Sequence, residues 1–199
     1  MPSRKNPYAK PDRWTRAAKQ AGFPARSVFK LEEIDRRMRL LRGGLRVLDL
    51  GASPGSWAMY AAARIAPAGK LLAVDLEPLR ASLPPNASFL LGDALALSND
   101  ELARFAPYDV VLSDMAPQTT GSRITDQARS YELFMRALAV AATLGGPGGA
   151  FVGKIFMSDD LPSARAELKR HYASERLIRP EGTRAISTEI FVVGCEKRA

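Results

Sequence analysis

The chain has 199 residues, a length that suits one domain with a full hydrophobic core. Its 46% hydrophobic and 25% charged content is typical of a globular protein and argues against a disordered or fibrous chain. The formal net charge of +8 predicts attraction to polyanions such as nucleic acid, although a basic surface that only aids solubility is the simpler alternative.

Basic residues are concentrated before the first expected strand. Residues 1–46 contain 13 lysines and arginines against four acidic side chains. We therefore expect a basic N-terminal segment over residues 1–25, followed by one folded domain over residues 26–199. No apolar segment follows this basic start, and no stretch approaches membrane-spanning length. The expected location is cytoplasmic, without a membrane partner.

The order of the apolar patterns predicts an α/β fold. Apolar residues recur every three or four positions over 26–41, which predicts a helix that Gly43-Gly44 ends. The Ser98-x-x-Glu101 capping box and a periodic stripe over 129–144 indicate further helices. Short apolar runs predict strands at Arg46–Leu50, Lys70–Val74, Ser88–Leu91, Asp109–Leu112, Ala150–Ile155 and Ile190–Gly194. Strands that alternate with helices form a mostly parallel, doubly wound sheet with helices on both faces.

A turn rich in small residues follows the first of these strands. Gly51 and Gly55 let the backbone come close to a ligand, and the next helix presents free N–H groups. A dinucleotide site prefers Gly-x-Gly-x-x-Gly, whereas here the glycines are four apart and Pro54 removes a backbone donor. This spacing disfavours a nicotinamide cofactor without excluding it.

Two carboxylates follow the next two strands. Asp75 ends the second strand, where a carboxylate accepts hydrogen bonds from the ribose hydroxyls of an adenosine. Asp93 follows the third strand, where an acceptor for an adenine amino group would lie in a methyltransferase-like sheet. The alternative for Asp93, and for Asp49 in the first strand, is that the side chain only caps a turn.

Five ordered segments resemble the FtsJ/RrmJ-type ribosomal RNA large-subunit 2′-O-methyltransferases. These segments are Ala25–Leu31, Asp49–Trp57, Ser113–Pro117, Phe151–Phe156 and Ser187–Phe191. The resemblance implies a Rossmann-like S-adenosylmethionine-dependent methyltransferase fold, with seven strands of which the last is antiparallel. It implies that S-adenosylmethionine is the cofactor and that it is held by Gly55, Trp57, Asp75, Asp93 and Asp114. It also implies a catalytic Lys-Asp-Lys-Glu tetrad at Lys30, Asp114, Lys154 and Glu189.

Lys154 also stands out without the resemblance, because it interrupts an apolar strand that would otherwise be wholly buried. His171 is the only histidine and Cys195 the only cysteine, which excludes a Cys-His nucleophile and a Cys/His zinc site. A ribose hydroxyl is a weak nucleophile unless a base takes its proton, and lysine is the natural candidate base here. Lys30 could favour the deprotonated amine, because a neighbouring cation opposes a second positive charge.

The resemblance leaves the target RNA open. Bacterial members of the family act on a uridine in large-subunit (23S) ribosomal RNA, so the expected partner is ribosomal RNA within the large subunit, and the chain is expected to be a monomer. Related families methylate transfer RNA or an RNA cap. An idle RNA-binding module on the same fold is a further alternative, although such a module is expected to have lost the tetrad.

Overall fold

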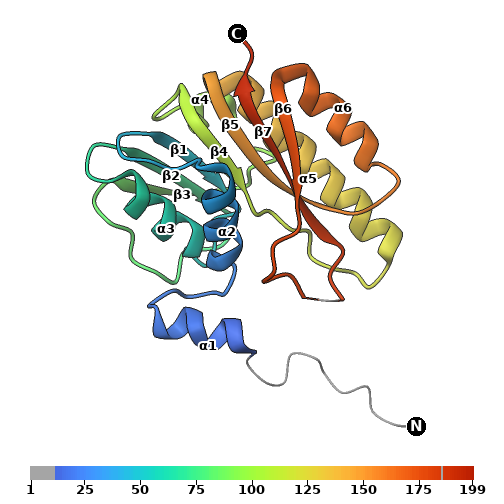
Figure 1. Cartoon of the computed structure of the whole chain (residues 1–199), viewed down its shortest axis with the longest axis horizontal. Helices are drawn as coiled ribbons and strands as arrows, with labels where there is room; N and C mark the ends of the chain where they lie inside the picture. The colour runs from blue at the N-terminus through green and yellow to red at the C-terminus, as the bar shows by residue number, and fades with distance from the viewer. Residues whose placement is uncertain (1–11, 185) are drawn as a thin grey trace.

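A mixed sheet of seven strands runs through the protein, as the computed structural model shows for residues 12–184 and 186–199 (Figure 1). The strands are β1 Arg46–Leu50, β2 Lys70–Asp75, β3 Ala87–Leu91, β4 Tyr108–Ser113, β5 Gly145–Phe156, β6 Tyr172–Ile178 and β7 Glu189–Lys197. Their order across the sheet is β3-β2-β1-β4-β5-β7-β6. Strand β7 runs antiparallel to both of its neighbours, β5 and β6, and the other four strand pairs are parallel. The expected seven strands with the last antiparallel are confirmed.

Helices cover both faces of this sheet. They are α1 Arg13–Gln20, α2 Val28–Met38, α3 Ser56–Ile65, α4 Asn99–Leu102, α5 Arg123–Leu144 and α6 Leu161–His171. Helices α2 and α3 pack on one face, whereas α5 and α6 pack on the other (Figure 1). Helix α1 lies apart from both layers, beside the beginning of α2. No helix among the described residues is both long and apolar enough to cross a membrane.

The central strands are apolar throughout because both of their faces are covered. In β1, Val47 belongs to the cluster under α2 and α3, and Leu48 to the cluster under α5. Both side chains are 0% exposed. Asp49 follows them on the Val47 face, and it is the one charged side chain of β1 within this apolar layer. The sheet therefore places a carboxyl group inside its own core.

Several element boundaries differ from the sequence expectation. Helix α5 begins at Arg123 instead of residue 129, because Ser122 caps it by accepting from the backbone N–H of Thr125. Helix α2 ends at Met38, where Arg39 takes a left-handed conformation, so Gly43-Gly44 is not what ends it. The capping box at Ser98 is present, but α4 is a single turn. Neither α1 nor β6 was among the elements expected from the apolar pattern.

The chain order puts the expected site residues that end, follow or begin strands at one edge of the sheet. Strands β1 and β4 are adjacent, yet the chain leaves them toward opposite sides, and ligands bind outside the carboxyl ends of strands at such a point. Asp75 ends β2, and Asp114 directly follows β4. Lys154 lies near the end of β5, and Glu189 begins the antiparallel β7. The fold thus brings residues that are far apart in the sequence to the same crevice.

Candidate active site

Lys154 and Asp114 form the centre of the crevice. Because β4 and β5 pair in parallel, the residue after β4 lies beside the end of β5. The Lys154 ammonium nitrogen, Nζ, donates to Asp114 Oδ1 at 2.9 Å and to the Asp114 carbonyl oxygen at 2.5 Å. Lys154 is 7% exposed, and Phe151, Val152 and Ile155 of the same strand are completely buried. A buried charge in an apolar strand needs a partner, and for Lys154 that partner is Asp114.

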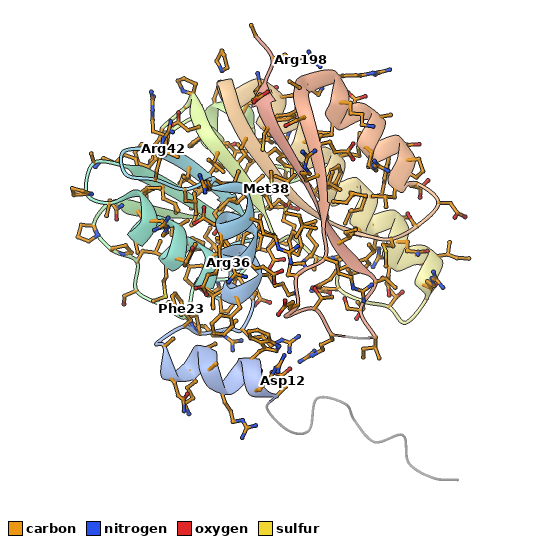
Figure 2. All side chains as sticks on the ribbon, in the orientation of Figure 1. Asp12, Phe23, Arg36, Met38, Arg42 and Arg198 are labelled. Carbon is orange, nitrogen blue, oxygen red and sulfur yellow. The ribbon has the colours of Figure 1, made fainter. Side chains whose placement is uncertain are left out.

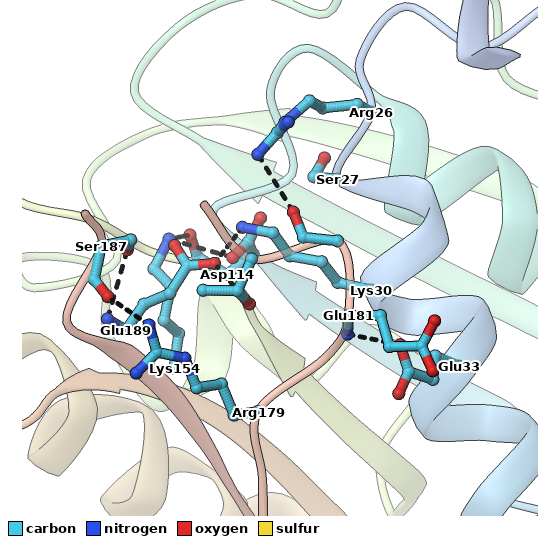
Figure 3. Close-up of polar contacts among 12 residues, drawn as sticks. Arg26, Ser27, Lys30, Glu33, Asp114, Lys154, Arg179, Glu181, Ser187 and Glu189 are labelled. Atoms are coloured by element: carbon cyan, nitrogen blue, oxygen red, sulfur yellow. Dashed lines mark hydrogen bonds and ion pairs between the residues drawn. The ribbon is translucent and has the colours of Figure 1, made fainter. Parts of the chain in front are cut away.

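Lys30 and Glu189 form a second ion pair against the first (Figure 3). Lys30 extends from α2, and its Nζ contacts Glu189 Oε1. Thr183 Oγ1 donates to the same oxygen at 3.3 Å. Burial alone would raise the pKa of Glu189, but the charges of Lys30 and Lys154 and the hydrogen bonds outweigh burial, and the pKa is lowered. Glu189 is therefore an ionised acceptor at neutral pH.

A cavity of about 730 Å³ opens over these two pairs. Lys30, Lys154 and Glu189 line it together with Ser27 and Phe156. Asp114 lines a neighbouring cavity of about 380 Å³, and Ala116 lines both. We call the larger space the catalytic cavity. Its volume is in the range of small-molecule sites, so it can take one nucleotide.

The opposite side of Asp114 faces the glycine turn. Gly51 has φ +78°, and a Cβ there would lie 2.7 Å from the backbone nitrogen of Met115. Only glycine allows the turn after β1 and the turn after β4 to approach so closely. Gly51 and Asp75 line the 380 Å³ cavity and also a smaller one of about 100 Å³, which Asp93 borders. Three of the expected cofactor residues, Asp75, Asp93 and Asp114, therefore surround one turn.

Both carboxylates at the ends of β2 and β3 are held by backbone donors. Ser53 N donates to Asp75 Oδ2 at 2.7 Å, and Glu77 N donates to Asp75 Oδ1 at 2.9 Å. Leu95 N donates to Asp93 Oδ1 at 2.8 Å. Each oxygen can accept more than one hydrogen bond, so these contacts fix the carboxylates and leave room for ligand donors.

Gly55 and Trp57 differ from the other expected cofactor residues, because neither lines the three cavities just described. Trp57 is 2% exposed, its ring lies tilted against that of Phe191, and its Nε1 donates to the carbonyl oxygen of Ser27 at 2.8 Å. Gly55 has φ +115° and begins α3. In this structure the Trp57 side chain joins α3 to the start of α2.

Asp49 is a buried group that the sequence-based site did not include. Its carboxyl group is 0% exposed, and neither oxygen has a hydrogen-bond partner among the described residues. Burial raises the pKa of Asp49 well above its ordinary value, and the Asp114 and Asp75 carboxylates raise it further. Turn capping was the alternative for Asp49 from the sequence, whereas the structure gives its side chain no capping contact.

The outer wall of the catalytic cavity also contains residues that were not expected there. Thr15 of α1 and the arginines at positions 26, 123 and 184 line it. Arg26 links two wall segments, because it pairs with Asp12 and donates to Gly182 O at 3.0 Å. The sequence offered no signal for Thr15, and the signal for the arginines was the excess of basic side chains, to which Arg26 adds its place in the Ala25–Leu31 segment. The loop before β7 brings Arg184 to this wall.

Comparison with known proteins agrees with this geometry. The FtsJ-like methyltransferase family matches residues 23–197 of the chain. A "Ribosomal RNA large subunit methyltransferase E" from Sorangium cellulosum is 68% identical over 195 residues, which cover 98% of this chain and 92% of the relative. The protein of the same name from Bdellovibrio bacteriovorus is 47% identical, with 96% and 99% of the two chains covered.

Solved structures share the fold. A candidate ribosomal RNA methyltransferase from Plasmodium falciparum superposes with a TM-score of 0.75 at 22% identity, covering 88% of this chain and 98% of the other. Human methyltransferase-like protein 13, solved with S-adenosylhomocysteine, gives 0.55 at 19% identity, covering 78% and 75%. These two likenesses concern the fold alone. The family match over nearly the whole length and the 68% identical relative go further: this chain belongs to the FtsJ-like methyltransferase family.

Proposed function

We propose that this protein transfers a methyl group from S-adenosylmethionine to a ribose 2′-hydroxyl, that of a uridine in large-subunit (23S) ribosomal RNA. The observation that carries the proposal is the meeting of two ion pairs, Lys154 with Asp114 and Lys30 with Glu189, where a nucleotide-sized cavity adjoins the cavity that Asp114 lines. The names of the bacterial relatives support ribosomal RNA of the large subunit as the substrate.

The acidic character of the glycine turn fits S-adenosylmethionine as the cofactor. Asp49, Asp75 and Asp114 influence one another electrostatically, and the buried carboxyl of Asp49 lacks a donor. Such a group of carboxylates favours a cation and repels the pyrophosphate of a dinucleotide. Asp75 and Asp93 would hold the adenosine part, and Asp114 would border the reacting end. When bound, S-adenosylmethionine supplies a methyl group on a positively charged sulfur, open to displacement.

Lys154 is proposed as the base that takes the proton of the 2′-hydroxyl. A deprotonated lysine amine has two N–H bonds and one lone pair. The two contacts with Asp114 use the two N–H bonds, so the lone pair remains for a hydroxyl proton in the catalytic cavity. Loss of that proton makes the ribose oxygen a stronger nucleophile. The resulting ammonium is balanced by the carboxylates of Asp114 and Glu189.

Lys30 and Glu189 are proposed to orient the ribose. The lowered pKa of Glu189 keeps it an acceptor, so it can receive a hydrogen bond from a ribose hydroxyl. Lys30 holds Glu189 in place from α2 and adds a positive charge close to Lys154. Correct orientation matters because in-line displacement requires the attacking oxygen to be aligned with the bond that breaks.

The test is transfer of a labelled methyl group to separated ribosomal subunits, intact ribosomes and transfer RNA, all from cells that lack the endogenous enzyme. We expect label in the RNA of the large subunit, at a linkage that resists alkaline hydrolysis because its 2′-oxygen is blocked. Label on a base would reject the ribose assignment. Label only in transfer RNA would change the substrate, and no transfer to any RNA would refute the proposal.

A further inference from the structure

A second open cavity adjoins the catalytic cavity. It has a volume of about 460 Å³ and shares Pro24 with the catalytic cavity. Its walls come from the end of α1, the turn before α2, the middle of α3 and the loop after β2. Arg80 lines both this cavity and the 380 Å³ cavity beside Asp75. The second cavity therefore touches both the proposed substrate site and the proposed cofactor site.

Two exposed cations stand at the rim of this second cavity. Lys19 comes from α1 and Arg80 from the loop after β2. Neither side chain forms an ion pair or a hydrogen bond with another described residue, unlike Lys30, Lys154 and Arg26 in the catalytic cavity. Uncompensated cations from two separate elements around one cavity are suited to an anionic ligand such as a phosphate.

Apolar side chains line the same cavity. Phe23 lies at the turn between α1 and α2 (Figure 2). Met59 belongs to α3 and lines the cavity with Phe23. Both are half-buried. An aromatic ring and a thioether side chain beside two free cations match the two parts of a nucleotide, since bases stack on aromatic rings while cations follow the phosphate backbone. The charge and the apolar lining together favour a nucleotide over a simple anion.

We propose that this cavity, which we call the flanking-nucleotide site, binds a nucleotide of the same RNA strand next to the one whose ribose enters the catalytic cavity. The inference rests on the proposed function, because it assumes an RNA substrate in the catalytic cavity. The base lies against Phe23 and Met59, and the phosphates contact Lys19 and Arg80. The strand passes from one cavity to the other at Pro24.

The test compares two double variants that lose the same charge. Lys19→Ala/Arg80→Ala removes the rim cations, and Lys70→Ala/Arg104→Ala removes two exposed cations outside the cavities described here. Binding of a short fluorescein-labelled oligouridylate is measured by anisotropy over a salt series. We expect the rim variant alone to bind more weakly and to lower the slope of log K against log salt by about 1.4. Affinity for S-adenosylmethionine is measured in parallel, because Arg80 borders the cofactor side.

A third variant tests the base contact. Phe23→Leu keeps an apolar side chain but removes the ring, and we expect a roughly 5- to 100-fold loss of oligouridylate affinity. An oligomer without bases in place of the oligouridylate should show no difference between this variant and the wild type. Thermal melts and cofactor affinity establish that the variants are folded.

The outcomes separate this inference from the proposed function. A wild-type protein that transfers no methyl group to any RNA would refute the proposed function. A wild type that methylates RNA, with rim and control variants of equal affinity and equal salt slope, would overturn the flanking-nucleotide site alone. The site would also be overturned if polyglutamate displaced the labelled oligouridylate as well as unlabelled RNA does, because the site would then select negative charge and not nucleotides.

Discussion

At the scale of single residues, Lys154 can be tested for its role as a base against a purely electrostatic role. Arginine keeps the positive charge but does not release its proton near neutral pH. Both Lys154→Ala and Lys154→Arg should therefore lower the single-turnover rate with bound RNA by about 10²- to 10⁴-fold. Rapid-quench measurement of labelled-methyl transfer gives the rate, and calorimetry checks that cofactor still binds.

Lys70→Arg is the matched control, because Lys70 begins β2 at the edge of the sheet away from the crevice. Its rate should equal that of the wild type. Substantial activity in Lys154→Arg would contradict the base assignment and would leave Lys154 an orienting role through Asp114.

Asp75 is proposed to hold the adenosine part of S-adenosylmethionine. Asp75→Ala should weaken S-adenosylmethionine binding by about 1.5–3 kcal/mol, the scale for loss of charge-assisted hydrogen bonds. Asp75→Asn keeps one acceptor oxygen and should lose less. Asp159→Ala removes an exposed carboxylate elsewhere and serves as the control. Unchanged affinity in Asp75→Ala, measured by calorimetry, would mean that the ribose lies elsewhere.

Glu189 links the site to pH. Its pKa in the folded protein is lowered from the ordinary value of 4.5, so its ionised form stabilises the fold above that pH. This stability is lost as the pH falls from 4.5 through the lower folded value. Glu189→Gln should therefore melt below the wild type at neutral pH, and the gap should shrink below pH 4.5. A gap that stays constant down to the acid limit would show that the Lys30 and Lys154 charges do not stabilise this carboxylate.

At the scale of elements, the central strands could be predicted from the sequence because both of their faces are apolar. All six expected strands are present. Strand β6 was not predicted because it is an edge strand, paired only with β7, and because three consecutive side chains in its middle are polar: Ser174, Glu175 and Arg176. Helix α1 was not predicted because Ala18 is its only buried residue, so it has no apolar stripe. Its first turn is capped by the Asp12 side chain.

The site was predictable in part for the same reason. Parallel strands bring their carboxyl ends to one edge, so Asp75, Asp93, Asp114 and Lys154 could be placed together. That Lys30 and Glu189 belong to the same site followed from family resemblance alone, and their pairing was not predicted, because no local pattern says which helix residue faces which strand. Asp49 was interpreted as a turn former, since nothing in a sequence shows that a buried carboxyl lacks a donor.

Helices α2 and α3 are joined by the Trp57 indole, which gives a test of its role. Trp57→Phe removes the hydrogen bond to Ser27 O and leaves that carbonyl without its donor. We expect the free energy of unfolding, measured with urea, to fall by about 1–3 kcal/mol. Affinity for S-adenosylmethionine should stay close to that of the wild type. If Trp57→Phe lost cofactor affinity while its free energy of unfolding stayed unchanged, the Trp57 side chain would belong to the cofactor site.

At the scale of the whole molecule, charge is divided between two surfaces with different ligands. Carboxylates gather around the glycine turn, where a cationic cofactor is proposed. Basic side chains gather around the catalytic cavity and the flanking-nucleotide site, which suits RNA. Lys154 lines the catalytic cavity and Asp114 lines the neighbouring 380 Å³ cavity, so a methyl donor and an acceptor strand can reach this pair through different cavities.

The division of the chain into a basic N-terminal segment and a methyltransferase domain stays a prediction. Part of that segment, residues 1–11, lies outside the described structure. The rest contributes α1, which borders the cavities through Thr15 and Lys19 and packs on the domain through Trp14 against Phe29.

A chain that begins at Phe23, where the family match starts, tests this division. The two apolar clusters that cover the faces of the sheet consist of residues after Phe23. The shortened chain should therefore still fold and should unfold in one cooperative transition. Its affinity for S-adenosylmethionine should remain, since the proposed cofactor residues begin at Gly55. RNA affinity should fall and depend less steeply on salt, because the cations of α1 are gone. Calorimetry, urea unfolding and a salt series of RNA binding measure the three quantities. If the shortened chain fails to fold, or binds RNA as tightly as the full chain, residues 1–25 are not a separate RNA-binding segment.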